Sequence, residues 1–319
     1  MLEELSKTPD FDVGMTGFDL PEISEILDQH GESKEDDEDD FDFEAAVEAV
    51  ETPVTKRGDL IELGPHRILC GDSSDENDVS ILMGKDKADI LNTDCPYNVN
   101  LGAGDRSNPN KSPKKSRKWP KIQSDNMPQP EYEAWMRKVL GIAKDYLKSG
   151  AAIYIWQGHR QFPPMYNILL ELGFHVSCVL CWLKESIAIS YADYCFRTEQ
   201  CLYGWLEGAP HYWAGKPGES NVWEVKRDPT NTYLHPTQKP VMLAHRAIEN
   251  SSKRGDVVLD LFLGSGSTLI GAESLGRRCY GCEIDPHYVD AVVRRYIAFV
   301  GEDKVSYEIK SKYLKEVNK

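Results

Sequence analysis

The sequence of 319 residues lacks any long apolar run, and no stretch approaches the roughly 18 apolar residues that a membrane-spanning helix needs. Its first ten residues, MLEELSKTPD, have neither the basic start nor the apolar core of a secretory signal. Eight cysteines in a chain without such a signal are typical of reduced thiols in a cytoplasm. These absences predict a cytoplasmic protein with no membrane partner.

Basic residues are fewer than acidic ones, which gives a net charge of −15, but this excess of acidic residues is confined to one segment. Residues 1–55 contain 19 acidic and 2 basic residues, which leaves 33 acidic and 35 basic residues in the rest. With few aliphatic residues to bury, residues 1–55 are predicted to be an acidic, disordered tail, with a short partner-binding helix as the alternative. Residues 56–319 are predicted to be the folded domain, and its near-neutral charge is compatible with a nucleic-acid partner.

Two cysteine pairs, at 178/181 and 279/282, have a spacing that zinc sites use. Both pairs lie inside predicted strands and lack the glycine-rich knuckles of zinc sites. The sequence therefore predicts buried thiols and no metal.

From residue 56 onward, β-rich runs alternate with helical patterns. The predicted strands are a hairpin at 58–72 and the runs at 88–94, 151–156, 174–184, 198–208, 256–262 and 278–285. The predicted helices lie at 129–148, between 157 and 172, and at 238–250, 267–276 and 286–300. This alternation indicates an α/β fold with a mostly parallel sheet covered on both faces.

A glycine-containing motif, DLFLGSGST, lies at a strand-to-helix junction at residues 260–268. Gly264 and Gly266 let the backbone turn sharply and approach a ligand, and the next strand places Glu283 where it could accept from a ribose diol. An ordinary tight turn and a nicotinamide or flavin site are the alternatives. Leu269 argues against the latter, because that fingerprint has a third glycine there.

A second motif, TDCPYNV, follows a predicted buried strand at residues 93–99. The carboxylate of Asp94 could hydrogen-bond an aromatic amine, and Tyr97 could stack on a base swung out of a duplex. A structural turn would also explain this motif. A third motif, HPTQKP at 235–240, precedes a helix, and Thr237 and Lys239 could hold a carboxylate there. Alone, it is as well explained as a proline-bounded helix start.

Together the motifs resemble the amino-group DNA methyltransferases of the β arrangement, in which the catalytic motif precedes the glycine loop. The resemblance implies a Rossmann-like, seven-stranded methyltransferase fold in permuted order, S-adenosylmethionine as cofactor, and double-stranded DNA as substrate. It extends over about residues 58–299. The segment FDLPEISEIL and the acidic spacer also resemble methylases fused to partitioning-protein-like nuclease domains.

The resemblance assigns two groups of residues. The catalytic pocket would consist of Asp94, Cys95, Pro96 and Tyr97. The cofactor would be held by Asp72, Asp94, Thr237, Lys239, Asp260, Phe262, Gly264, Ser265, Gly266, Ser267, Thr268 and Glu283. In this assignment Asp72 lies beside the adenine, Glu283 binds the ribose, and residues 265–268 hold the methionine part.

Cys95 departs from the family, whose usual catalytic sequence is DPPY. The expected function is methylation of adenine N6, because an acidic residue at position 94 is more usual in adenine enzymes of this kind. The alternatives are methylation of cytosine N4, or a DNA-binding relative with weak or no catalysis because of Cys95.

Two further segments are candidates for contacts with DNA. A basic loop at 102–124 includes Lys114, Lys115, Arg117 and Lys118, which could bind phosphates, with a solvated insertion as the alternative. Residues 185–232, rich in aromatic and polar side chains, are predicted to be a small target-recognition region. The oligomeric state stays open, with a homodimer as one alternative.

Overall fold

The computed structural model describes residues 41–98, 126–188, 193–225 and 239–314. Within the chain, Glu38–Lys319 is one compact unit. None of the helices in the described ranges combines the length and the apolar content that crossing a bilayer requires.

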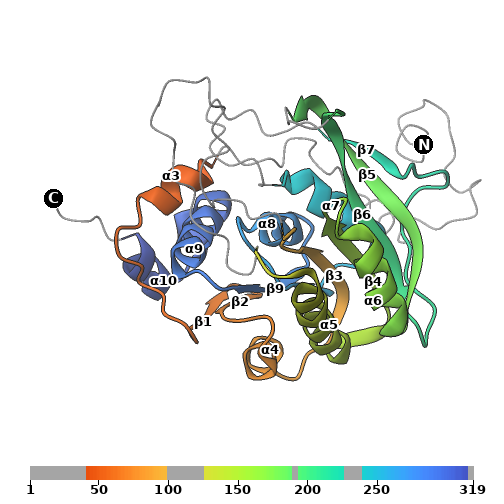
Figure 1. Ribbon diagram of the computed structural model, residues 1–319. Helices are drawn as coiled ribbons and strands as arrows, with labels where there is room; N and C mark the ends of the chain where they lie inside the picture. The colour runs from red at the N-terminus through yellow and green to blue at the C-terminus, as the bar shows by residue number, and fades with distance from the viewer. Residues whose placement is uncertain (1–40, 99–125, 189–192, 226–238, 315–319) are drawn as a thin grey trace, which may run out of the picture. The chain divides into compact units, whose positions relative to one another are not determined.

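The described part of the unit is built on a nine-stranded sheet with the order β1-β2-β9-β8-β3-β4-β6-β5-β7 (Figure 1). Neighbouring strands from β2 to β4 in this order are parallel, whereas β6 is antiparallel to both β4 and β5. The strands are β1 (Leu60–Leu63), β2 (His66–Cys70), β3 (Ala88–Asp94), β4 (Leu147–Gln157), β5 (Phe174–Ala188), β6 (Phe196–Leu206), β7 (Val222–Glu224), β8 (Val257–Asp260) and β9 (Arg278–Glu283).

Helices cover both faces of the sheet, because side chains on the inner strands alternate between two apolar clusters. One cluster joins the sheet to α3, α7, α8, α9 and α10, and the other joins it to α4, α5 and α6. The helices are α3 (Phe43–Glu48), α4 (Glu76–Met83), α5 (Gln129–Asp145), α6 (Phe162–Glu171), α7 (Val241–Ser251), α8 (Ser267–Ser274), α9 (Pro286–Val300) and α10 (Tyr307–Tyr313), with a 3₁₀ turn at Glu302–Lys304. The predicted α/β fold with two covered faces is therefore confirmed.

The sheet has a topological switch point between β8 and β3, which are parallel neighbours although they are far apart in the sequence. From β3 the chain passes through α5 to β4 on one side, and from β8 it passes through α8 to β9 on the other. In open α/β sheets, ligands bind at such a point, beyond the carboxyl ends of the strands. Asp94, Asp260 and Glu283 are the last residues of β3, β8 and β9 and meet at this edge.

The strand count and the first boundary differ from prediction. The short strands β1 and β7 lie at the two edges and bring the sheet to nine strands, whereas the resemblance implied seven. β1 was predicted as the first arm of the hairpin at 58–72, and β7 was not predicted. The chain before residue 56 is also part of the unit, since α3 packs on α9 and both Phe43 (3% exposed) and Val50 (6% exposed) are buried. The acidic composition of residues 1–55 predicted disorder, so Phe43 and Val50 were not predicted to be core residues. Residues 1–40 of the predicted tail lie outside the described ranges.

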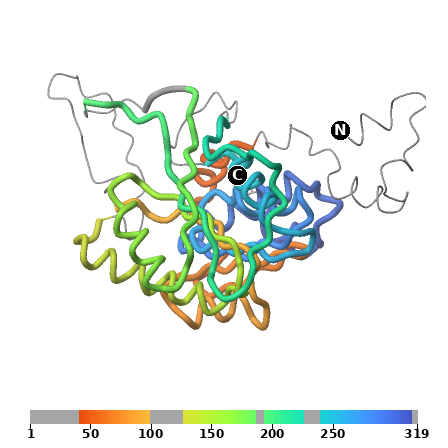
Figure 2. The backbone as a smooth tube through the Cα atoms, turned by 90° about the vertical axis from the view of Figure 1, so that its right-hand side faces the viewer, coloured from red at the N-terminus to blue at the C-terminus, as the bar shows by residue number. Residues whose placement is uncertain are grey.

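The region predicted for target recognition, 185–232, contains sheet strands. β6 lies between β4 and β5 and buries Cys201 and Leu202 completely, so its second half, residues 201–206, belongs to the core. Among the described aromatic residues of the region, Trp223 and Tyr203 are buried, and the ring of Tyr203 packs on that of Tyr154 with centroids 5.0 Å apart. The exposed ones include Tyr194, Phe196, Tyr212 and Trp213. Figure 2 shows β5 and β6, in green, as a long hairpin. Residues 189–192 and 226–238 of this region are outside the described part.

Cys279 and Cys282 both lie on β9 and are buried, but they belong to the clusters on opposite faces of the sheet. One metal ion could not bind both thiols. Among the described residues, no group of three or more histidine, cysteine or acidic side chains is arranged to hold a metal.

Candidate active site

A cavity of about 560 Å³ opens at the switch point. This volume is within the usual range of a few hundred to about 1,000 Å³ for small-molecule sites. The cavity brings together nearly all of the predicted site residues that the structure describes. It is lined by Asp72, Asp94, Cys95, Pro96, Tyr97, Lys239, Asp260, Phe262, Gly264, Ser265, Ser267, Thr268 and Glu283.

One predicted residue, Gly266, is absent from this set, and others lie outside the described residues. Gly266 does not line the cavity; it precedes α8 with φ +82°, and a Cβ there would lie 3.0 Å from Val292 Cγ1. Thr237 lies outside the described ranges, as do Lys114, Lys115, Arg117 and Lys118 of the predicted basic loop. The turn therefore requires glycine at position 266, and its predicted contact with the cofactor stays a prediction.

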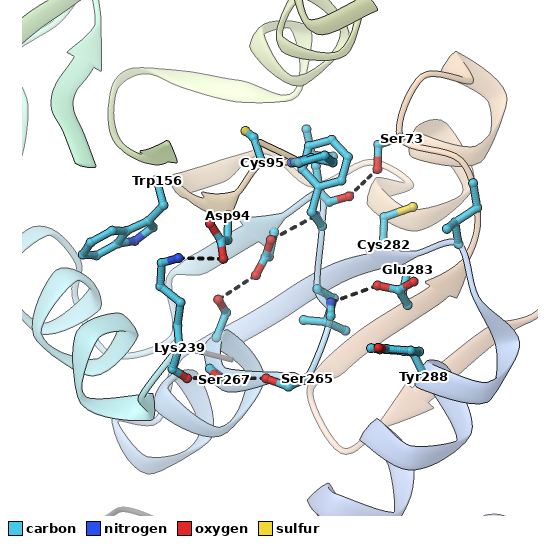
Figure 3. A pocket seen from close by; sticks show the side chains of 18 of the residues that line it. Ser73, Asp94, Cys95, Trp156, Lys239, Ser265, Ser267, Cys282, Glu283 and Tyr288 are labelled. Atoms are coloured by element: carbon cyan, nitrogen blue, oxygen red, sulfur yellow. Dashed lines mark hydrogen bonds and ion pairs between the residues drawn. The ribbon is translucent and has the colours of Figure 1, made fainter. Parts of the chain in front are cut away.

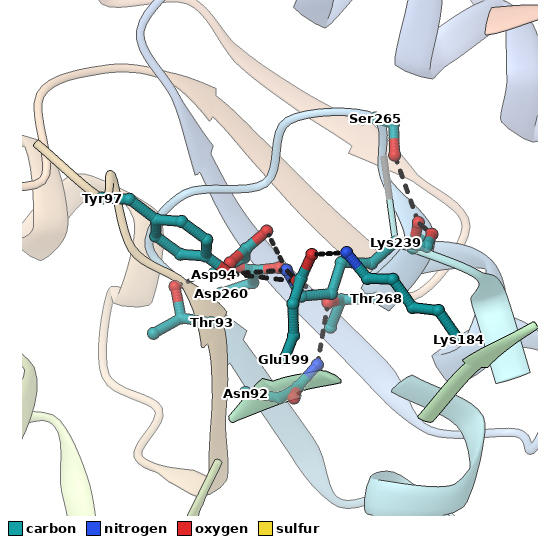
Figure 4. A network of polar contacts seen from close by, with 11 residues as sticks. Asn92, Thr93, Asp94, Tyr97, Lys184, Glu199, Lys239, Asp260, Ser265 and Thr268 are labelled. Carbon is teal, nitrogen blue, oxygen red and sulfur yellow. Dashed lines mark hydrogen bonds and ion pairs between the residues drawn. The ribbon is translucent and has the colours of Figure 1, made fainter. Parts of the chain in front are cut away.

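Lys239 lies at the catalytic end of the cavity (Figures 3 and 4). Its ammonium donates to Asp94 Oδ2 at 2.7 Å and to the Tyr97 hydroxyl at 2.9 Å, and lies 2.9 Å from Glu199 Oε2. An ammonium has three N–H donors, so these contacts can use all of them. The geometry favours a role in holding Asp94, and not the predicted contact of Lys239 with the cofactor's carboxylate.

Glu199, near the start of β6, is a functional candidate that sequence reasoning did not find. It lies between two cations, Lys239 and Lys184, whose ammonium pairs with Glu199 Oε1. These cations overcome the effect of burial and lower the pKa of Glu199 to about 2. Its partners are 15 and 40 residues away along the chain, so no local motif marked it. The signal that could have identified Glu199 was its charge inside the predicted strand at 198–208.

Asp94 keeps one oxygen available for a ligand. Oδ2 is bound by Lys239, whereas Oδ1 is buried and has no hydrogen-bond partner among the described residues. Burial raises the pKa of Asp94, and Lys239 acts in the opposite direction. An unsatisfied buried acceptor is costly unless a ligand supplies its donor. Asp94 Oδ1 is thus suited to accept a hydrogen bond from a ligand.

The loop that follows β3, residues 95–98, is held by contacts that do not involve position 95, where the family usually has a proline. The hydroxyl of Tyr132 donates to the Pro96 carbonyl at 2.6 Å. The Asn98 side chain, at a residue with φ +54°, forms two bonds with the backbone of Met127, at 2.9 and 2.7 Å. These contacts compensate for the backbone freedom of Cys95, which is itself 2% exposed.

The other end of the cavity is built from backbone groups around Glu283. Its two carboxylate oxygens accept from the N–H groups of Gly264 and Asp285, each at 2.9 Å. Burial nevertheless raises the pKa of Glu283 to about 7. A carboxylate can accept about four hydrogen bonds, and Glu283 lines the cavity, so it is suited to accept from a diol.

Asp260 and Thr268 connect the two ends. Thr268 Oγ1 donates to Asp260 at 2.6 Å and accepts from Asn92 at 3.0 Å, while Thr93 donates to the other oxygen of Asp260 at 2.9 Å. Both residues line the cavity, but these polar atoms bind each other. Their contacts join β3, β8 and the start of α8, which positions the glycine loop.

This fold and this cavity together define a methyltransferase of the S-adenosylmethionine-dependent class. A family model described as DNA methylase matches residues 88–294, and a model described as ParB-methyltransferase HTH domain matches residues 1–57. The chain belongs to the DNA methylase family whose members act on N6 or N4 amino groups, and S-adenosylmethionine is its cofactor.

Known proteins agree with this assignment. The chain is 28% identical to the type II methyltransferase M2.DpnII of Streptococcus pneumoniae over 67% of its own length and 84% of that protein. It is 25% identical to M.BglII of Bacillus subtilis over 63% of its own length and 61% of that protein.

Solved structures support the fold. The complex of M1.HpyAVI with its cofactor has a TM-score of 0.51 at 22% identity, and covers 72% of this chain and 98% of that one. The PvuII DNA methyltransferase, described as cytosine-N4-specific, has a TM-score of 0.57 at 17% identity, with 79% and 92% covered.

The cavity fits S-adenosylmethionine chemically. The cofactor carries a positive sulfonium and a ribose diol, and the cavity wall supplies the carboxylates of Asp72 and Glu283. Glu283 is fixed by backbone donors in a position suited to the ribose, and the glycine loop brings backbone groups to the wall. We therefore assign the Glu283 end to the adenosyl part and the Asp94 end to methyl transfer.

Proposed function

We propose that this protein methylates the N6 amino group of adenine in double-stranded DNA. The observation that carries transfer to an exocyclic amine is the free oxygen of Asp94, held by Lys239 at the end of a cavity that also contains Tyr97. The choice of adenine rests on the acidic residue at position 94, which is more usual in the adenine enzymes of this family. A base inside a duplex cannot reach this cavity, so the target adenine must swing out of the helix.

Asp94 acts on the amine through hydrogen bonding. The lone pair of an aryl amine is delocalised into its ring, which makes the nitrogen a poor nucleophile. Oδ1 accepts from the NH₂ group and favours the tetrahedral nitrogen, while Lys239 opposes the rise that burial causes in the pKa of Asp94. When bound, S-adenosylmethionine supplies the electrophilic methyl group. The amine proton leaves readily once the nitrogen is methylated, so a strong base is not needed.

Tyr97 provides the surface on which the extruded base stacks. Its ring lies 5.3 Å from the ammonium of Lys239, and its hydroxyl is bound by that ammonium. These contacts fix the ring in the cavity wall before a base arrives, which lowers the entropic cost of binding. The fixed loop also favours an active enzyme over the weakly catalytic relative that Cys95 suggested.

The double-stranded DNA would be held by the basic loop at 102–124. Lys114, Lys115, Arg117 and Lys118 supply the positive charge that phosphates require. The loop follows the catalytic motif directly in sequence, which supports this role.

Incubation with tritiated S-adenosylmethionine and mixed genomic DNA, followed by digestion and mass spectrometry of the nucleosides, tests the proposal. We expect N6-methyladenine, and none with Asp94→Ala. A methylcytosine peak without methyladenine would transfer the same mechanism to cytosine N4. Absence of any methylated nucleoside, from a protein that binds the cofactor and DNA, would establish the non-catalytic alternative.

A further inference from the structure

One wall of the cavity comes from helix α3, outside the segment that the methylase family model matches. Phe43 and Glu44 line the cavity together with Tyr288 of α9. The rings of Phe43 and Tyr288 meet edge to face, with centroids 5.6 Å apart. The methylase family model matches residues 88–294, whereas α3 lies in the segment 1–57 that the ParB-methyltransferase HTH model matches.

The position of α3 is fixed by the chain on both sides of it. Asp42 caps the helix by accepting from the Ala45 N–H at 3.0 Å. Farther along, the N–H groups of Val54 and Thr55 donate to the two oxygens of Asp290, at 2.7 and 3.1 Å. Asp290 is fully buried on α9, two residues after Tyr288. The same helix therefore supplies one ring of the pair and anchors the segment that carries the other.

The aromatic pair lies at the adenosyl end of the cavity. Tyr288 is on the Glu283 side and Asp94 is on the opposite side (Figure 3). Burial raises the pKa of Tyr288, and the negative charges of Glu44, Glu283 and Asp285 raise it further. Its hydroxyl therefore stays protonated. Two uncharged aromatic rings at this end offer the flat apolar surface on which a purine packs.

We propose that Phe43, supported by Tyr288, forms an aromatic wall for the adenosyl part of S-adenosylmethionine. The segment before the methylase domain is then a component of the cofactor site. This proposal rests on the family's cofactor and not on the choice of adenine over cytosine as the target base. An enzyme that methylates either base, or neither, can still be tested for it.

Calorimetric titration of the full-length protein with three ligands tests the wall. S-adenosylmethionine, S-adenosylhomocysteine and 5′-methylthioadenosine share the adenosyl group, and the last lacks the amino-acid part. Phe43→Ala should weaken all three by about 5- to 10-fold, the effect of losing one aromatic contact. Val50→Ala is the matched control, because Val50 is buried in the same segment but does not line the cavity. We expect it to change each affinity by less than about 2-fold.

Three results would overturn the proposal: unchanged affinities in Phe43→Ala, an equal loss in Val50→Ala, or a loss confined to the two ligands with the amino-acid part. The last result would place Phe43 at the wrong end of the cavity. Phe43→Leu preserves most of the buried volume and decides the matter if Phe43→Ala does not fold. We expect a loss of about 2- to 4-fold from the leucine variant, since the aromatic face is gone.

Discussion

The two ends of the cavity hold their carboxylates in different ways. At the catalytic end, Asp94 is positioned by charged side chains from distant parts of the chain, Lys239, Glu199 and Lys184. At the adenosyl end, the carboxylate of Glu283 is positioned by backbone N–H groups of its own neighbourhood. The first arrangement sets the ionisation of Asp94, and the second sets the geometry of Glu283. Chemistry and cofactor binding should therefore respond to different substitutions.

The largest expected effect is on the rate of methyl transfer. Asp94→Ala removes the only acceptor that we assign to the target amine, and loss of one such preorganised contact lowers rates by roughly 100- to 1,000-fold. Single-turnover transfer of tritium to DNA measures this change. Asp86→Ala, in a partly exposed carboxylate outside the cavity, is the control. Transfer by Asp94→Ala within 10-fold of the unmodified protein would remove Asp94 from the chemistry.

At the other end, Glu283→Ala should weaken cofactor binding by about 1–3 kcal/mol, the usual cost of losing hydrogen bonds to a charged group. Isothermal titration with S-adenosylmethionine gives the change. Part of the loss will come from the freed N–H groups of Gly264 and Asp285. Glu283→Gln preserves one acceptor oxygen and should lose less. An unchanged dissociation constant in both variants would exclude Glu283 from the site.

The charges around Asp94 predict a pH dependence with opposite signs for two variants. Only the carboxylate form is active, so activity is lost as the pH falls through the pKa of Asp94. Lys239→Met removes the cation that lowers this pKa, and the acid limb should move to higher pH. Glu199→Gln removes an anion that raises it, and the limb should move to lower pH.

Profiles of single-turnover rate against pH, at saturating cofactor, measure both shifts. Thermal unfolding of each variant checks that the buried cluster still folds, because removal of one partner from a buried ion pair is costly. Shifts in the same direction for both variants would show that charge does not set the ionisation of Asp94.

The smallest expected effect concerns the connection between the ends. Thr268→Val removes a donor to Asp260 and should destabilise the fold by about 1–3 kcal/mol, measured by urea unfolding. Burial raises the pKa of Asp260 to about 6, so the loss should be larger at pH 8, where the carboxylate is charged, than at pH 5. Thr268→Ser retains the hydroxyl and should show little of this pH dependence.

Sequence patterns predicted the elements that carry strong periodicity. Helix 286–300 was predicted with the bounds of α9, and the strand at 88–94 with those of β3. Short elements escaped because they carry too few residues for a pattern: α3, β7 and α10 have 6, 3 and 7 residues. β6 was recognised as a strand, but it was also included in the region predicted to contact DNA, because composition does not reveal which of its side chains are buried.

The residues of the candidate site also fall into two groups, those that the sequence predicted and those that it did not. Motifs with fixed local spacing, such as the glycine loop and TDCPY, were found and lie at the cavity. Glu199 and Phe43 were missed, because their positions depend on pairings between segments far apart in the chain. The predicted role of Lys239 also rested on its motif alone, whereas its contacts come from β3 and β6.

The affinity of Asp94→Ala for S-adenosylmethionine, measured by calorimetry beside that of Glu283→Ala, tests the separation of the two ends most directly. We predict that Asp94→Ala binds within about 2-fold of the unmodified protein, while Glu283→Ala loses about 1–3 kcal/mol. A loss in Asp94→Ala as large as that in Glu283→Ala would contradict the account, since Asp94 would then be a cofactor ligand like Glu283.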